Sequence, residues 1–227
     1  TLTKISVQGL GSTSENADII RESVMQAPQG PPDQPVVMIA YSKGANDVLA
    51  ALALYPEVAE RVSAVVSISG AIAGSPLALH ARDWALNILA AMPGVDCEVP
   101  DETALTSLRP DIRRAWLEEH PLPKTVAYYS IVSFPEKDRI STALRPTYRM
   151  LARHDSHNDG QLIVSDQVMP GSQLLALVNA DHWAIALPVK RLHPALNSAG
   201  ITRNDFPLEV LFEAILEYVD LDLDDAL

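Results

Sequence analysis

The sequence has little cysteine, no long apolar run and a deficit of positive charge. Its only cysteine is Cys97, so an internal disulfide and a cysteine-based metal site are both excluded. No stretch of about eighteen uncharged apolar residues is present, which excludes a membrane-spanning helix. The 17 basic residues are outnumbered by 29 acidic ones, and a net charge of −12 disfavours nucleic acid as a partner because phosphate backbones are repelled.

The rest of the composition is that of a folded domain. Of the 227 residues 48% are hydrophobic and 20% are charged, and no low-complexity block interrupts them, so intrinsic disorder is excluded. We therefore predict one domain over residues 1–227. The compartment stays open, because a single cysteine fits an exported bacterial protein as well as an internal one. The chain begins at Thr1 without the charged and apolar regions of a signal peptide.

Short apolar, β-branched runs alternate with segments of helical periodicity. The runs predict strands at residues 5–7, 36–40, 64–68, 125–132 and 174–178. Between them, Ser12 and Glu15 stand at capping-box spacing before a first helix, residues 45–52 form a second, and residues 207–219 form a closing helix ahead of an acidic, solvated end. This alternation predicts an α/β fold with a mostly parallel sheet covered by helices on both faces.

The pattern changes between residues 71 and 123. Trp84, Ile88, Leu89 and Met92 indicate one helix, and a stripe at Ile112, Ala115 and Trp116 indicates a second. We interpret residues 71–123 as a helical insertion. Two roles remain open for it: a second small core, or a lid that covers the site.

The most informative motif is Ala40-Tyr41-Ser42-Lys43-Gly44, between a buried strand and a helix. A serine on such a sharp turn has its hydroxyl raised above the sheet, and the turn favours small residues two positions before and after it. The backbone N–H of Lys43, at the helix N-terminus, would face an oxyanion on a substrate carbonyl. Taken alone, the motif also fits an ordinary strand–helix turn.

Four stretches together make the chain resemble the α/β-hydrolase family, specifically its lipase and esterase branch. These are the motif around Ser42, Ser69-Gly70-Ala71 with Ala73-Gly74-Ser75-Pro76, Tyr128-Tyr129-Ser130, and Asn158-Asp159-Gly160 followed by Asp181-His182. The resemblance extends over nearly the whole chain from Ile5 onward. Ala40 departs from the family pattern, which usually has glycine there.

The resemblance implies a catalytic triad of Ser42, Asp159 and His182, in that chain order, with no cofactor. His182 follows the strand at 174–178 by a few residues, which places it in a loop above a strand end, as a general base requires. Asp181 is its sequence neighbour, so its side chain points elsewhere and we do not expect it to orient the histidine.

A metal site is the alternative use of residues 154–159, where two histidines stand three apart among carboxylates. We prefer to interpret this stretch as a polar loop that delivers the acid Asp159, and we predict no metal.

The family's second oxyanion donor comes from a loop after an earlier strand, often marked His-Gly. No such strand precedes Ile5. The segment Gln8-Gly9-Leu10-Gly11 is one alternative, but only one helix would then separate it from the Ser42 strand, where the family has a helix, a strand and a helix. We therefore expect the N-terminal strands of the fold to be missing here or to lie in upstream sequence.

These residues predict a serine hydrolase that cleaves carboxylic esters through an acyl-serine intermediate, with a small-molecule ester or lipid as substrate. Two alternatives remain. One is a catalytically silent scaffold that binds a ligand or protein partner. The other is an acyltransferase or thioesterase, which would use the same residues.

Overall fold

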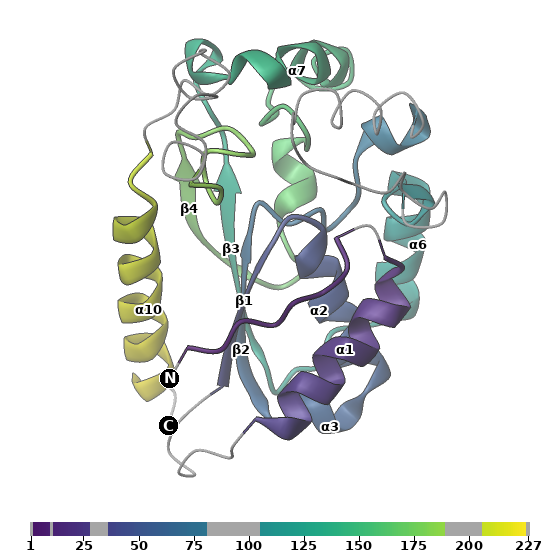
Figure 1. The fold of residues 1–227 in the computed structure, drawn as a ribbon, viewed down its shortest axis with the longest axis vertical. Helices are drawn as coiled ribbons and strands as arrows, with labels where there is room; N and C mark the ends of the chain where they lie inside the picture. The colour runs from purple at the N-terminus through teal and green to yellow at the C-terminus, as the bar shows by residue number, and fades with distance from the viewer. Residues whose placement is uncertain (1, 10, 28–35, 81–104, 189–205, 226–227) are drawn as a thin grey trace.

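The computed structural model describes residues 2–9, 11–27, 36–80, 105–188 and 206–225. Its centre is a four-stranded sheet within this part of the chain, with strands in the order β1-β2-β3-β4 and every neighbouring pair parallel. The strands are β1 (Val36–Tyr41), β2 (Val62–Ile68), β3 (Ala127–Ser133) and β4 (Gln173–Val178). Because all four are parallel, their carboxyl ends meet at one edge of the sheet, which is the upper edge in Figure 1.

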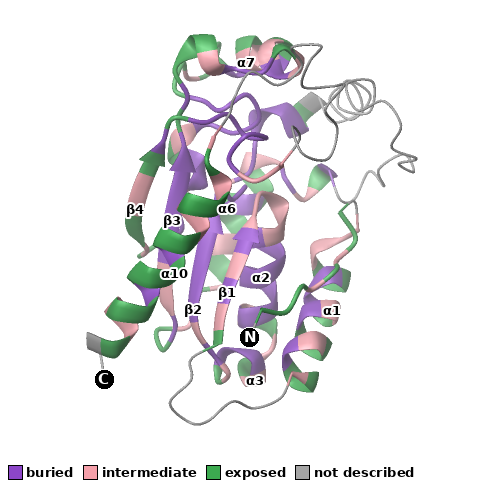
Figure 2. Ribbon diagram, turned by 60° about the vertical axis from the view of Figure 1, so that its left-hand side comes forward, coloured by how far each residue is buried: buried purple, intermediate pink, exposed green. Residues whose placement is uncertain are grey.

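Helices cover both faces of this sheet (Figure 1). One face packs against α1 (Thr13–Gln26), α2 (Lys43–Leu54), α3 (Pro56–Ala59) and α6 (Pro110–Glu119). The other face packs against α10 (Leu208–Asp225), whose Ile215 and Val219 join a second core with Val66 and Ile131. Figure 2 shows that β2 and β3 are mostly buried between these two layers, whereas β4 is mostly exposed or half-buried. The predicted α/β fold class, with a parallel sheet covered on both faces, is confirmed.

Short helices gather beyond the carboxyl ends of the strands. They are η1 (Pro76–His80), η2 (Lys137–Arg139), η3 (Thr142–Leu144), α7 (Arg145–Leu151) and η4 (Val164–Gln167). In Figure 1 α7 and its neighbouring segments form the top of the molecule, whereas η4 packs beside β3. The carboxyl edge of the sheet is where parallel α/β proteins place their functional groups.

The capping box predicted for the first helix is present. The Glu15 backbone N–H donates to Ser12 Oγ at 3.2 Å, and the Ser12 backbone N–H donates to Glu15 Oε2 at 3.2 Å. These two bonds satisfy amide groups that a helix N-terminus otherwise leaves without partners. Local hydrogen bonding therefore sets the start of α1 at the place that the capping-box spacing predicted.

The strand predicted at residues 5–7 is wrong. This segment is extended, but it does not pair with any strand among the described residues, and it crosses the sheet at an angle (Figure 1). Ile5 and Val7 are partly buried against the core shared by α1 and α2. An apolar alternation reports burial of one face of the backbone, whereas a strand also needs a neighbour for its hydrogen bonds.

The acidic stretch from residue 220 belongs to α10, which continues through Asp225, and Asp220 and Asp224 are exposed to solvent as predicted. Tyr129 donates its hydroxyl hydrogen to Asp222 Oδ2 at 2.6 Å, and this contact ties the end of α10 to β3. The acidic run therefore belongs to the same helix as the apolar residues that pack α10 against the sheet.

Within residues 71–123, α6 corresponds to the second expected helix. The stripe from Trp84 to Met92 lies outside the described residues. Leu77, Leu105 and Leu108 pack with Leu151 and Leu162 in a separate small core, while Trp116 packs against the main core.

Candidate functional site

Ser42 lies on the turn between β1 and α2, in an unusual backbone conformation. Its φ of 53° and ψ of −128° fall in a region that residues with a Cβ seldom adopt. Two backbone hydrogen bonds hold it there: Ser42 N–H donates to the Ile68 carbonyl at 3.1 Å, and Ala71 N–H donates to the Ser42 carbonyl at 3.1 Å. The adjacent strand end therefore fixes the serine, and its side chain stays partly exposed.

Gly70, which follows the end of the adjacent strand, lies closely against the helix that begins after Ser42. A Cβ placed on Gly70 would lie 2.1 Å from Ser67 Oγ and 2.9 Å from Ala45 Cβ. A Cβ placed on Gly44 would have no described atom within 4 Å. The close approach at Gly70 involves the segment after β2, which the motif around Ser42 does not include.

His182 lies directly beside Ser42. Its Nε2 is 2.9 Å from Ser42 Oγ, and its Nδ1 is 2.8 Å from Asp159 Oδ2. The imidazole is 1% exposed and Asp159 is 0% exposed, so the pair is shielded from water. Three loops that are far apart in sequence thus bring a hydroxyl, an imidazole and a carboxylate into one hydrogen-bonded line.

The histidine is also held through its backbone. Tyr41, which precedes Ser42, donates its hydroxyl hydrogen to the His182 carbonyl at 2.5 Å, and the two rings lie 5.1 Å apart. The His182 N–H donates to the Asp159 carbonyl at 3.0 Å. Burial raises the pKa of Tyr41 well above its usual value, so this phenol stays a neutral donor.

The Asp159 carboxylate accepts hydrogen bonds on both oxygens. Oδ1 accepts from the backbone N–H groups of Gln161 at 2.8 Å and Leu162 at 2.7 Å. Oδ2 accepts from Ser133 Oγ at 2.5 Å and Gln167 Nε2 at 3.3 Å, besides the imidazole. The sequence patterns did not identify Ser133 or Gln167 as contacts of Asp159. Only Ser133 could have been suspected, because it is a serine at the carboxyl end of a buried strand.

Asp181 is as buried as Asp159, but its carboxylate accepts hydrogen bonds from the surrounding loops and not from His182. Its Oδ2 accepts from the Ser141 N–H at 2.7 Å and also from the Ser141 hydroxyl. Its Oδ1 accepts from the N–H groups of Trp183 at 3.1 Å and Ala184 at 2.9 Å. Burial raises the pKa of Asp181, and the hydrogen bonds from Ser141 and Ala184 oppose that shift.

The stretch considered as a metal site separates into two groups. Asp155 and His157 contact each other at 2.9 Å on the surface, and the hydrogen bonds from His157 lower the pKa of Asp155. Asp159 points inward to His182. In the part of the chain that the structure describes, no three His, Cys, Asp or Glu side chains are grouped to hold a metal ion.

Lys43 takes part in a buried polar chain that the sequence did not reveal. Its Nζ donates to Asp47 Oδ1 at 2.8 Å, and Asp47 Oδ2 accepts from Asn16 Nδ2 at 2.9 Å. Asn16 also binds both backbone groups of Gln8, at 2.8 and 3.0 Å. Burial raises the pKa of Asp47, and Lys43 opposes that shift. The chain ties the segment before α1 to the helix that follows Ser42.

Comparison with solved structures gives a consistent fold. A metagenomic carboxyl esterase matches 97% of this chain at 42% identity, with a TM-score of 0.85. This chain spans 65% of the length of that esterase. The Bacillus licheniformis lipase BlEst2 in its mature form matches 87% of this chain and 77% of its own, at 19% identity and a TM-score of 0.66.

Lipase 1 from Pelosinus fermentans matches 82% of this chain and 71% of its own, at 13% identity and a TM-score of 0.59. At such identities the two lipases show a shared fold alone. No protein-family model matches the chain, and a search of curated proteins gives no match. None of the described helices is long and apolar enough to cross a bilayer.

The parallel sheet, the strained serine turn and the 42% identical esterase agree. The chain has the α/β-hydrolase fold and is similar, over most of its length, to a carboxyl esterase.

Proposed function

We propose that this protein hydrolyses carboxylic esters, with Ser42 as nucleophile, His182 as general base and Asp159 as the orienting acid. One observation carries the proposal: the line from Ser42 Oγ to His182 Nε2 at 2.9 Å and from His182 Nδ1 to Asp159 Oδ2 at 2.8 Å. The 42% identity to a carboxyl esterase supports the same substrate class.

The reaction follows from this geometry. His182 Nε2 takes the proton of Ser42 as Oγ attacks the ester carbonyl carbon, and Asp159 stabilises the imidazolium that forms. The tetrahedral intermediate collapses, the carbon–oxygen bond to the alcohol breaks, and His182 returns the proton to the leaving oxygen. Water then attacks the acyl-serine with His182 again as base, which releases the carboxylic acid and restores Ser42.

The tetrahedral oxygen carries a negative charge that needs preorganised donors. We assign one donor to the backbone N–H of Lys43, the first residue of α2. The N-terminal end of this helix adds partial positive charge at the same place. The Lys43 side chain is engaged by Asp47, so its role at the oxyanion is assigned to the main chain alone.

We further propose that residues 1–227 form one hydrolase domain in which residues 71–123 are an insertion that covers the entry to Ser42. The support is its place in the sequence, between β2 and β3, where a minimal fold needs one helix. The apolar residues of its described part pack into cores. The lid role therefore rests on the stripe from Trp84 to Met92.

The decisive experiment is Ser42→Ala with a p-nitrophenyl ester as substrate. We expect loss of at least about 10⁴-fold in rate with an unchanged unfolding midpoint, because the nucleophile is removed from a partly exposed position. A fluorophosphonate probe should label the wild-type chain and not Ser42→Ala.

Ser75→Ala is the matched control, since the hydroxyl of Ser75 donates to the Gln161 carbonyl at 2.6 Å and contacts no base. It should keep both the activity and the label. Labelling of Ser42→Ala, or activity above a few per cent, would show that another nucleophile acts.

A further inference from the structure

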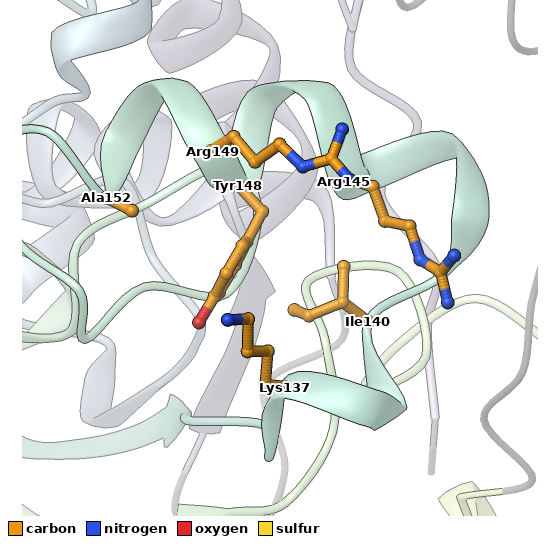
Figure 3. A pocket seen from close by; sticks show the side chains of 6 residues that line it. All are labelled: Lys137, Ile140, Arg145, Tyr148, Arg149 and Ala152. Carbon is orange, nitrogen blue, oxygen red and sulfur yellow. The ribbon is translucent and has the colours of Figure 1, made fainter.

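A pocket opens at the carboxyl edge of the sheet between η2 and α7 (Figure 3). Its volume of about 440 Å³ is within the range of small-molecule sites. It shares no lining residue with the Ser42–His182–Asp159 triad. Three lining side chains are cationic and three are apolar or aromatic: Lys137, Arg145 and Arg149, and Ile140, Tyr148 and Ala152.

None of the ion pairs among the described residues involves these three cations, although Glu136 and Asp138 flank Lys137 in the chain. Lys137 comes from η2, whereas Arg145 and Arg149 are four residues apart on α7 and so lie on one helix face. No carboxylate lines the pocket. This grouping is notable in a chain with twelve more acidic than basic residues.

Grouped like charges raise the free energy of the folded state, and a bound anion would relieve that repulsion. Guanidinium groups suit this task because they donate two parallel hydrogen bonds to a carboxylate or phosphate. In Figure 3 the ammonium group of Lys137 lies beside the Tyr148 hydroxyl, and the Arg145 guanidinium lies beyond Ile140. The rim is therefore cationic and the wall between is apolar.

We propose that this pocket binds an anionic amphiphile. Its carboxylate or phosphate head lies at the rim that Lys137, Arg145 and Arg149 make cationic, and its apolar part packs on Ile140 and Tyr148. The proposal is independent of ester hydrolysis, because it uses no group of the triad.

Trp183 lies next to the pocket wall, so its fluorescence can report on binding. Ile140 and Tyr148 pack in one cluster with Trp183, the residue after His182. A ligand seated on this wall changes the surroundings of the indole, so binding should change tryptophan fluorescence as well as release or absorb heat.

The test is titration calorimetry on the Ser42→Ala chain with octyl phosphate, octanoate and neutral octyl glucoside. We expect both anions to bind more tightly than the neutral compound, with affinity that falls as salt is added. The triple variant Lys137→Gln, Arg145→Gln, Arg149→Gln should weaken anion binding by about tenfold or more. Hydrolysis of a neutral p-nitrophenyl ester by the same triple variant with Ser42 intact should be unchanged.

Arg149→Gln and Arg153→Gln form the matched pair. Both arginines are exposed and four residues apart, but only Arg149 lines the pocket. The first variant should weaken binding several-fold and the second should not. Tighter binding of octyl phosphate would indicate a phosphate-bearing lipid, and tighter binding of octanoate a fatty acid. Equal affinity for the neutral compound, equal effects of the paired variants, or full binding by the triple variant would overturn the proposal.

Discussion

Two buried carboxylates lie next to the same histidine, and they do different things. Asp159 and Asp181 are both 0% exposed, and each accepts two backbone N–H groups on Oδ1. Their second oxygens differ: Oδ2 of Asp159 meets His182 Nδ1, whereas Oδ2 of Asp181 meets Ser141. Burial and backbone hydrogen bonds therefore do not distinguish the acid of a triad from a carboxylate that holds loops together. The two are distinguished by the group that contacts Oδ2.

The largest expected effect is that of Asp159→Asn on the rate. We expect a loss of about 10³–10⁴-fold in kcat, since the new amide would present a donor to His182 Nδ1 and favour the wrong tautomer. The amide oxygen can still accept from Gln161 and Leu162, so the chain should fold. Initial rates with a p-nitrophenyl ester and the circular dichroism spectrum measure the two readouts. A rate within tenfold of wild type would show that Asp159 is not the orienting acid.

Asp181→Ala should affect stability more than rate. Its loss leaves the N–H groups of Ser141, Trp183 and Ala184 without their acceptor inside the protein. We expect the free energy of unfolding in urea to fall by about 2–4 kcal/mol, with kcat within about tenfold of wild type. If instead the rate fell as far as in Asp159→Asn while stability stayed unchanged, the assignment of the two acids would have to be exchanged.

Asp181 should also affect how the unfolding free energy depends on pH, and we expect this effect to be smaller than that of Asp181→Ala. Burial raises the pKa of Asp181 in the folded state above its usual 3.8, so between these two values the folded chain holds more protons than the unfolded one. The contribution of Asp181 to the unfolding free energy therefore falls as pH rises through this window, by at most about 1.4 kcal/mol per pH unit. In urea unfolding from pH 3.5 upward, the unfolding free energy of wild type relative to that of Asp181→Asn should fall with pH, because the difference isolates Asp181 from the other carboxylates.

Asp155→Ala should have the smallest effect. Its carboxylate contacts His157 at the surface and lies in the same polar loop as Asp159, so it controls for loop disturbance. We expect kcat within about twofold of wild type and an unchanged thermal midpoint. A large loss of rate here would mean that the loop as a whole, and not the Asp159 carboxylate, determines activity.

Local sequence patterns predicted much of the frame. The apolar runs predicted β1 to β4 to within two residues at each end, and Ser12 with Glu15 predicted the start of α1. These features are local: burial on both faces selects apolar, β-branched residues in β2 and β3, and a capping box closes over four positions. The motif around Ser42 and the chain order of Asp159 and His182 predicted the three side chains that the structure brings into contact.

Contacts between distant segments could not be predicted in the same way. Ser133 and Gln167 reach Asp159 because β3 and η4 pack side by side, and Asn16 meets Asp47 because α1 packs on α2. No short sequence pattern identifies these residues as contacts of the site, because their partners lie in distant segments of the chain. The strand predicted at residues 5–7 failed for the same reason, because pairing depends on a neighbour.

The sequence by itself determined the α/β alternation, the serine turn and the candidate triad, because propensity, capping and motif spacing act within a few residues. Only the tertiary structure decided which carboxylate faces His182, which glycine packs closely against the helix after Ser42, and where three cations line one pocket. Those outcomes depend on distances of 2–4 Å between segments up to 140 residues apart in the chain, as between Ser42 and His182. Such distances are set by packing of the whole sheet and its helices, and no single segment encodes them.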